Sequence, residues 1–535
     1  MNLGSLGQDS MAKYGEHDSF YFEGRWYTNV EMELNANRLG NALKSLGIRR
    51  GDRVAIQMPN SPVVLWSFPA IYKIGAIAVP MNPLLRPDQS AYIFQNCGAK
   101  AVITSPEYVP WIQAARKHTS ELRNVIVTEK DNIPDTLNYD QFTKVQPDTL
   151  CIEDTENEDI AALIYTAGTT GPNKGVMHTH YSLYATATGF AEYMQRQIPT
   201  TLTSISHIMD AREHKAVEVK CKVTGVNRNR LGLLVLPLSH MFGLILYLIQ
   251  TVNGGKSIIM KWFNIEEVLK TIQYFRVNAF SGVPSMYIMM LNHPDFAKYD
   301  LNSLQECNCG AAPLAPETGL LWKQKTGADI CEGWGMTETC GTTCVNTSAR
   351  PPRYGSIGIC AVKANKVSVV DNDDREVKPG ISGELVVKGP SVMKGYWKMP
   401  EETAETLRNG WMHTGDIGHM DEDGYFFITD RKKDIIIRGG ENVSPREVEE
   451  VLVQIPQILE VGVIGIFDKT YGEEIKAFCV LRKDAAISSE EIIIFCKQKL
   501  PSFKVPKTVQ FVDSLPKNLL GKLLRSELRK LEKQA

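Results

Sequence analysis

The sequence predicts an α/β protein with a large N-terminal domain of layered α/β sheets, a small β-rich subdomain and a small α+β C-terminal domain. Two observations predict this class. Short β-branched runs alternate with helical patterns through the first four-fifths of the chain, which is typical of largely parallel sheets covered by helices. Strand patterns with Asp and Gly turns, typical of hairpins, appear from Lys366 on. The length of 535 residues allows two to four domains.

The clearest elements of the layered part can be placed from their periodicity. Strands are expected at Arg53–Gln57, Ala101–Thr104 and Ser257–Met260. Helices are expected at Glu31–Leu46 and Ile265–Tyr274, where apolar residues recur at helical spacing.

One apolar stretch, Leu231–Val252, has the length of a membrane span. Pro237, Ser239 and His240 interrupt it near its middle. We therefore expect a buried strand, a short loop and a buried helix there, and no transmembrane segment.

The charged stretch Asp430–Asp434 lies between two strand patterns and is predicted to join the domains. This gives an N-terminal domain over residues 1–431 and a C-terminal domain over residues 432–535. A polar segment between Tyr193 and Leu233 is expected to be a surface insertion or an extra hairpin.

Composition excludes several classes of protein. The 59 Lys and Arg residues nearly balance the 61 Asp and Glu residues, so there is none of the basic excess that a dedicated nucleic-acid binder shows. The 11 cysteines are scattered and odd in number, which favours reduced thiols over a disulfide framework. The N-terminus shows no signal-peptide pattern, so we expect a cytoplasmic protein.

A loop rich in glycine and hydroxyl groups follows the apolar strand pattern Ile160–Ile164. It runs from Tyr165 to Gly175 and combines three threonines with several glycines and Lys174. Glycines let backbone N–H groups approach an anion, hydroxyls donate hydrogen bonds, and lysine neutralises charge. The loop therefore suits phosphate or pyrophosphate, although the Walker A spacing does not fit it.

This loop resembles the phosphate-binding signature of the adenylate-forming superfamily, which contains acyl-CoA synthetases, peptide-synthetase adenylation domains and beetle luciferases. Further segments resemble the motifs of that superfamily in the same order: Leu236–Gly243, Gly310–Leu314, Glu332–Thr339, Trp411–Asp416, Asp430–Asp434, Gly439–Val443 and Leu515–Lys522. The first 160 residues share with the superfamily only the general alternation of strand and helix patterns. Acyl-CoA synthetases are the most similar members.

The resemblance implies activation of a carboxylic acid in two steps. The acid attacks the α-phosphate of ATP to give acyl-AMP and pyrophosphate, and coenzyme A then displaces AMP. ATP, Mg²⁺ and coenzyme A are the implied cofactors. The acid is expected to be medium-sized, whether fatty, branched, alicyclic or aromatic.

The resemblance also implies roles for individual residues. Lys522 is expected to bridge the attacking carboxylate and the α-phosphate, Thr337 to donate to that phosphate, and Glu338 to hold Mg²⁺. Lys433 is the expected hinge about which a mobile C-terminal domain rotates. The expected nucleotide and coenzyme A contacts are Thr166, Gly168, Thr169, Thr170, Gly171, Lys174, Gly310, Ala311, Ala312, Glu332, Gly333, Trp334, Gly335, Asp416, Arg431, Gly439, Gly440 and Glu441. The expected acyl pocket comprises His240, Phe242, Gly243, the turn of Ser281, Gly282, Val283 and Pro284, and Met336.

Some positions depart from the family pattern. Ala167 stands where serine is usual, and Asn518 replaces a common threonine. No essential charge is lost, so activity is expected. An adenylation enzyme that loads a carrier protein, a luciferase-like oxygenase and a nucleotide-binding regulator without turnover are the alternatives, and a homodimer is a further expectation.

Overall fold

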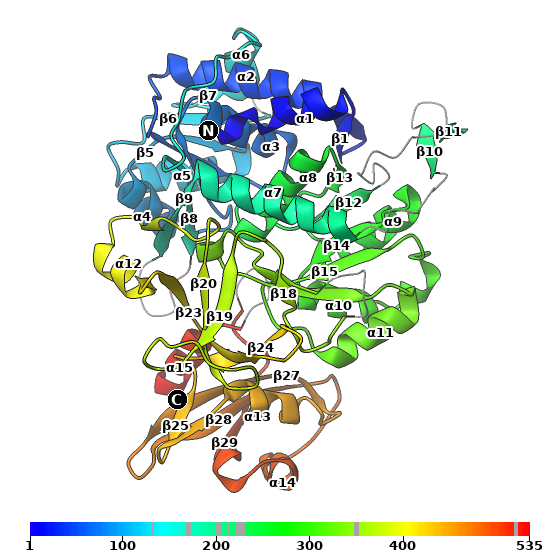
Figure 1. Cartoon of the computed structure of the whole chain (residues 1–535), viewed down its shortest axis with the longest axis vertical. Helices are drawn as coiled ribbons and strands as arrows, with labels where there is room; N and C mark the ends of the chain where they lie inside the picture. The colour runs from blue at the N-terminus through cyan, green and yellow to red at the C-terminus, as the bar shows by residue number, and fades with distance from the viewer. Residues whose placement is uncertain are drawn as a thin grey trace.

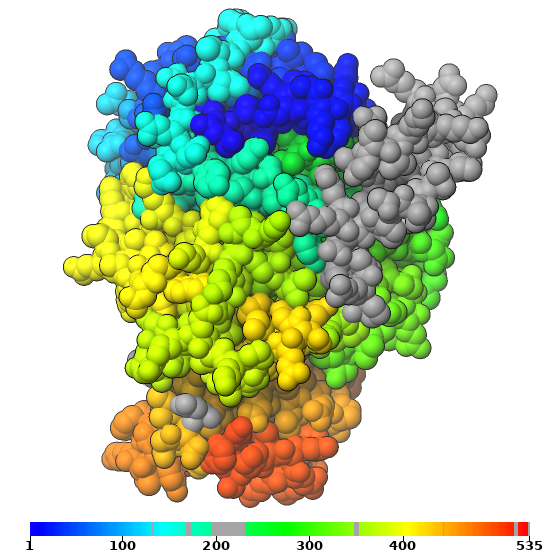
Figure 2. All heavy atoms as spheres, in the orientation of Figure 1, coloured from blue at the N-terminus to red at the C-terminus, as the bar shows by residue number. Residues whose placement is uncertain are grey.

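The computed structural model describes residues 1–129, 133–166, 173–197, 206–210, 215–219, 230–346, 352–517 and 523–534. A large N-terminal body carries two big sheets, a β-rich subdomain lies beneath them, and a small C-terminal lobe follows (Figure 1). This arrangement confirms the expected fold class. In the space-filling view the C-terminal lobe, orange to red, packs against the yellow and green part of the chain (Figure 2).

The first large sheet has nine strands and a parallel centre. Their order is β18 (Ile359–Cys360), β17 (Cys344–Val345), β16 (Ile330–Trp334), β15 (Glu306–Cys309), β14 (Ala279–Gly282), β12 (Leu231–Leu234), β13 (Lys256–Ile259), β1 (Asp18–Phe22) and β2 (Arg25–Thr28). Helices α8 (Met241–Asn253), α9 (Ile265–Phe275), α10 (Pro284–Leu291) and α11 (Pro316–Thr326) connect the parallel strands.

The second large sheet has eight strands. Their order is β21 (Gly395–Tyr396), β9 (Lys174–Thr179), β8 (Ile160–Thr166), β4 (Ile77–Pro80), β3 (Arg53–Gln57), β5 (Ala99–Thr104), β6 (Asn124–Val127) and β7 (Leu137–Asn138). Its helices are α1 (Leu6–Tyr14), α2 (Asn29–Ser45), α3 (Pro62–Lys73), α4 (Pro87–Cys97), α5 (Val109–Arg116), α6 (Tyr139–Lys144) and α7 (His180–Gln197). One hydrophobic core joins α3 and α8 to strands of both sheets.

The β-rich subdomain and the C-terminal lobe each have a five-stranded sheet. The subdomain contains β19 (Lys366–Val370), β20 (Gly383–Lys388), β22 (Leu407–Arg408), β23 (Trp411–Met420) and β24 (Phe426–Arg431), with α12 (Pro400–Thr406) beside them. The lobe contains β25 (Ile436–Arg438), β26 (Glu441–Val443), β27 (Ile458–Asp468), β28 (Gly472–Leu481) and β29 (Thr508–Phe511), with α13 (Pro445–Leu452), α14 (Ser489–Lys499) and α15 (Arg525–Gln534).

Local chemistry explains where the main elements begin and end. Helix α2 starts at a capping box, in which Thr28 and Glu31 each bond the other's backbone N–H. The apolar stretch from Leu231 forms buried β12 and α8, as expected, and α8 ends at Gly254 in the left-handed conformation. Among the residues described, no helix combines the length and the apolar character needed to cross a bilayer.

The polar insertion contains an antiparallel hairpin of β10 (Ser206–Asp210) and β11 (Lys215–Val219). The extra hairpin that the sequence suggested is therefore confirmed for these two strands. The other residues between 198 and 229 lie outside the described part of the chain.

Candidate functional site

A cleft of about 2370 Å³ lies where the two large sheets, the β-rich subdomain and the C-terminal lobe meet. The residues that line it range from Pro80 to Arg529, so segments more than 350 residues apart in the sequence meet at this cleft. The parallel strands β14 to β16 point their carboxyl ends at it, which is where α/β sheets usually bind ligands.

The ends of β8 and β9 bring two of the expected phosphate contacts together. Thr166 and Lys174 are paired across these strands, and both line the cleft. The loop between them, with Gly168, Thr169, Thr170 and Gly171, lies outside the described residues.

Glu338 lies close to this phosphate end. Tyr396 donates a hydrogen bond from its Oη to Glu338 Oε1 at 2.9 Å, and the Lys174 ammonium lies 4.9 Å from the centre of the Tyr396 ring. Tyr396 therefore links Lys174, the cation expected to face phosphate, to the carboxylate expected to bind Mg²⁺. Sequence reasoning missed Tyr396, because nothing near Gly395 and Tyr396 in the chain points to Glu338.

A buried histidine holds the turn that carries Thr337 and Glu338. His178 Nε2 lies 2.7 Å from the carbonyl oxygen of Thr337, and its Nδ1 lies 3.1 Å from Cys340 Sγ. Burial lowers the pKa of His178 to about 4, so the ring is neutral at physiological pH. A neutral ring that donates to Thr337 can accept from the Cys340 thiol, which satisfies both nitrogens.

Two buried histidines make the stability of the fold depend on pH. Burial lowers the pKa of both His178 and His180 from 6.5 to about 4. The unfolded chain therefore binds protons that the folded chain excludes. The free energy of unfolding is therefore highest above pH 6.5. It falls as pH drops toward 4, by up to about 3 kcal/mol per histidine. We expect His178→Gln to flatten this fall, measured as the urea midpoint across that pH range. The exposed His118→Gln should retain the slope of the unmodified protein, and equal slopes for all three proteins would contradict the prediction.

Asp416 is placed to receive two hydroxyl groups. Its carboxylate is 2% exposed and lines the cleft. Trp334 donates its indole N–H to Oδ2 at 2.9 Å, and Arg431 Nε lies 2.7 Å from Oδ1. Each oxygen has two acceptor sites, so one remains on each for a ligand such as a ribose diol.

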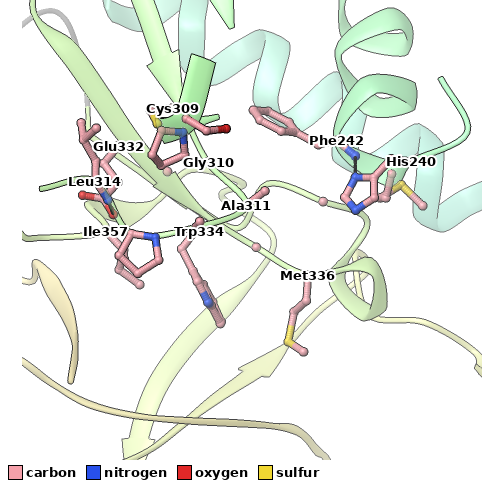
Figure 3. A pocket seen from close by; sticks show the side chains of 18 of the residues that line it. His240, Phe242, Cys309, Gly310, Ala311, Leu314, Glu332, Trp334, Met336 and Ile357 are labelled. Carbon is pink, nitrogen blue, oxygen red and sulfur yellow. Dashed lines mark hydrogen bonds between the residues drawn. The ribbon is translucent and has the colours of Figure 1, made fainter. Parts of the chain in front are cut away.

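The wall beside Asp416 is flat and mostly apolar. Gly310 and Ala311 line it from the turn after β15 and Glu332 and Trp334 from strand β16, with Ile357 beside them (Figure 3). Ala312 and Gly333 line it too. Trp334 also belongs to the hydrophobic core of the subdomain, so its ring is held in place.

Two backbone features shape this wall. Ala311 has a positive φ of 69°, which costs an alanine about 1 kcal/mol or more and turns the chain sharply at the cleft. Gly335 allows a close approach of backbone, because a Cβ there would lie 1.3 Å from the carbonyl oxygen of Gly341.

Glu332 is a buried acid within this wall. Its Oε1 accepts a hydrogen bond from the Leu314 N–H at 3.2 Å. Burial raises the pKa of Glu332 to about 7, even though that hydrogen bond and Arg446 act in the opposite direction. Near neutral pH the group therefore exists in both protonation states.

Five of the expected acyl-pocket residues line the cavity and three do not. His240, Phe242 and Met336 line it, and His240 Nδ1 also caps α8 by accepting the Phe242 N–H at 3.2 Å (Figure 3). Ser281 and Pro284 of the expected turn line it as well, whereas Gly282 and Val283 between them are buried and do not. Alternate strand residues face opposite sides of the sheet, and a Cβ at Gly282 would meet the Phe280 ring at 3.2 Å.

Gly243 also lies away from the cavity. It allows α8 to approach the loop before it, because a Cβ at this position would lie 2.3 Å from the carbonyl oxygen of Pro237. Its role in this structure is therefore to pack the helix.

The C-terminal lobe contributes residues on both sides of Lys522 to the lining of the cleft. Lys522 itself lies outside the described residues, but Lys517 and Leu523 on either side of it line the cleft. Lys433 lines it as well. The pKa of Lys433 is lowered mainly by partial desolvation and, to a smaller extent, by the nearby Arg431 guanidinium. Gly439, Gly440 and Glu441 are exposed in the β25–β26 turn and do not line the cleft.

A two-lobed α/β protein with these groups around one cleft is an ATP-dependent, AMP-forming ligase. The chain belongs to the AMP-binding enzyme family, which residues 7–397 match, and residues 447–522 match the AMP-binding enzyme C-terminal domain. The resemblance to adenylate-forming enzymes is thereby confirmed.

Known proteins of this kind resemble the chain over its whole length. A long-chain-fatty-acid–CoA ligase of Bacillus subtilis (strain 168) is 34% identical, over 98% of this chain and 94% of that protein. A feruloyl-CoA synthase of an Amycolatopsis species is 33% identical, over 95% and 94%. A crystal structure of an anthranilate CoA ligase in complex with anthranoyl-AMP has a TM-score of 0.88 at 28% identity and covers 100% of this chain and 98% of that one. ATP-bound MatB from Rhodopseudomonas palustris has a TM-score of 0.86 at 28% identity, over 100% and 99%.

ATP, Mg²⁺ and coenzyme A are the cofactors of this chemistry. Glu338 suits Mg²⁺, which proteins usually bind through one or two carboxylates together with substrate phosphates and water. One of its oxygens accepts from Tyr396, and the side chain lines the cleft. A cation held there would neutralise phosphate charge.

Proposed function

We propose that this protein is an acyl-CoA synthetase that joins a carboxylic acid to coenzyme A by way of an acyl-adenylate. The observation that carries this proposal is that Lys174, Glu338 and Asp416 all line one cleft, which also receives the chain on both sides of Lys522. A binding protein without turnover would have no need of a lysine-bearing segment from a second lobe.

In the first step the acid lies between His240 and Phe242, and the ATP ribose is held by Asp416. The acid oxygen attacks the α-phosphorus and pyrophosphate leaves, while Thr337 and Lys522 stabilise the negative charge that both reactants bring. In the second step the thiol of coenzyme A attacks the acyl carbon and AMP leaves. Rotation about Lys433 then exchanges the Lys522 segment for the exposed turn of Gly439, Gly440 and Glu441, so one cleft serves both reactions.

The test is an assay of pyrophosphate release with ATP, Mg²⁺ and a panel of acids, with and without coenzyme A. Acid-dependent release together with thioester formation supports the proposal. Release without a thioester would favour loading of a carrier protein. No release with any acid would favour a nucleotide-binding regulator.

Glu332 provides a pH signature for adenine binding in this scheme. We propose that its free oxygen accepts the exocyclic amino group of adenine, which a carboxylate does better than a carboxylic acid. Since the pKa of Glu332 is raised to about 7, the KM for ATP should fall about two- to fivefold as pH rises from 6 to 8. Glu332→Gln keeps the shape and one acceptor but cannot ionise, so its KM should not follow pH. A variant that retains the pH dependence of the unmodified enzyme would assign that dependence to another group.

The size of the acid, the domain boundary at residue 431, a cytoplasmic location and pairing of two chains stay predictions. Gel filtration of the full chain tests the pairing.

A further inference from the structure

One face of the nine-stranded sheet bears small side chains where it borders the cavity. Two rows cross this face in strand register. The far row consists of Ser257, Gly232, Ala279 and Glu306, and the middle row of Leu234, Ser281 and Asn308. All seven residues line the cavity. Ala279 and Ser281, at the centre of the two rows, are small and leave space above the sheet, whereas the Ser257 hydroxyl lies 2.9 Å from where a Cβ of Gly232 would be.

The opposite wall is a single stripe of helix α8. Phe242, Leu246, Ile249 and Gln250 line the cavity at helical spacing, so they share one side of the helix. Phe190 and Met194 of α7 line it as well. The space between helix and sheet is therefore an apolar channel, which we call the acyl channel.

The two walls of the acyl channel have matching lengths. Gly310 lies four residues beyond Glu306 on the sheet side, which corresponds to roughly 13 Å. Gln250 lies eight residues beyond Phe242 on α8, which corresponds to about 12 Å.

Polar pairs stand at the far end of the acyl channel. Ser257 donates a hydrogen bond to Gln250 Oε1, and Arg230 Nε lies 2.7 Å from Glu306 Oε2. The apolar walls stop at these groups. Ser257 is paired with Gln250, and Arg230 with Glu306. An alkyl chain that passed these polar groups would gain no apolar contact and would offer them no hydrogen-bond partner.

Resting on the proposed function, we infer that the acid is a straight-chain alkyl carboxylic acid whose terminal methyl group lies at the far row. Its carboxylate lies at the Gly310 end of the channel, where the Phe242 ring packs against Gly310 in this structure and has to turn aside for the acid, since a Cβ at Gly310 would meet that ring at 3.3 Å. An extended alkyl chain advances roughly 1.3 Å per carbon, so about ten to twelve carbons fill the channel. A single aromatic ring would fill about half of it and leave the rest of the apolar wall without contacts.

Two substitutions should shorten the longest acid that the acyl channel accepts, each to a different length. Ala279→Leu narrows the far row and should lower kcat/KM for dodecanoate at least tenfold, while hexanoate changes less than twofold. Ser281→Leu narrows the middle row, roughly 7 Å nearer the carboxylate, and should also exclude octanoate. Ala297→Leu, the same change at an exposed alanine outside the cavity, is the matched control and should leave the profile as it was.

The experiment measures thioester formation for straight-chain acids of six to eighteen carbons and for a phenylpropenoic acid. A preference for about ten to twelve carbons, shortened in order by the two variants, supports the inference. Equal loss for all acids in both variants, an unmoved profile, or a preference for the phenylpropenoic acid overturns it. If the unmodified enzyme activates acids but its profile does not move, only the channel assignment fails, whereas no activation of any acid removes the proposed function as well. If Ala279→Leu does not fold, Ser281→Leu carries the same test, with its thermal unfolding curve, followed by circular dichroism, reporting its fold.

Discussion

Lys522→Ala is expected to lose acyl-adenylate formation by about 100- to 10,000-fold, the scale for removing a preorganised charge contact from a transition state. The carboxylate and the α-phosphate are both negative, and the two described residues that flank Lys522 face the cleft where they would meet. The measurement is pyrophosphate release under saturating ATP and acid. The same variant should still convert supplied acyl-AMP to the thioester, because that step does not bring two anions together.

Lys517→Ala is the matched control for this experiment. Lys517 lies in the same segment and lines the same cleft, but it is already paired with Glu460 at 2.5 Å. Its loss should therefore change adenylation only a few fold. Near-normal adenylation by Lys522→Ala, or an equal loss in both half-reactions, would remove the role assigned to Lys522.

Local sequence patterns predicted the elements of this fold well. The periodicity at Glu31–Leu46 became α2, and the interrupted apolar stretch from Leu231 became a strand and a helix. Such patterns succeed because the apolar face of a helix or strand must be buried wherever the chain goes. The resemblance to the motifs of the adenylate-forming superfamily implied that Glu332, Trp334 and Asp416 share one site, and all three line one cleft.

Two features were harder to predict: which side of a sheet a given strand residue faces, and which distant residue a side chain contacts. Four successive residues from Ser281 to Pro284 were expected in the acyl pocket, but only Ser281 and Pro284 line the cavity, because neighbouring residues of a strand point to opposite sides of a sheet. The hydrogen bond from Tyr396 to Glu338 joins residues 58 apart, and no local pattern encodes it. The acyl channel depends on the register of four strands, which the sequence does not display.

Asp416→Asn is expected to lower kcat/KM for ATP by about 100- to 1,000-fold, since truncating a buried, hydrogen-bonded charge costs several kcal/mol. The asparagine amide keeps the shape of the side chain but lacks the negative charge that Arg431 approaches at 2.7 Å. Its NH₂ group would also replace one of the two oxygens that now accept from Arg431 and Trp334, so a donor would face a donor there. A ribose diol would then find at most one good acceptor.

The ratio of kcat/KM for ATP to that for 3′-deoxy-ATP separates ribose recognition from a general loss of structure. The unmodified enzyme should favour ATP strongly, and Asp416→Asn should bring the ratio close to one, because the group that reads the hydroxyl is gone. Asp421→Asn is the control: it removes a carboxylate of the same subdomain that pairs with Arg353 and lies outside the cavity. This control should keep the full preference for ATP even if its stability falls. A preference that survives in Asp416→Asn would mean that another group holds the ribose, and the nucleotide would then have to lie differently in the cleft.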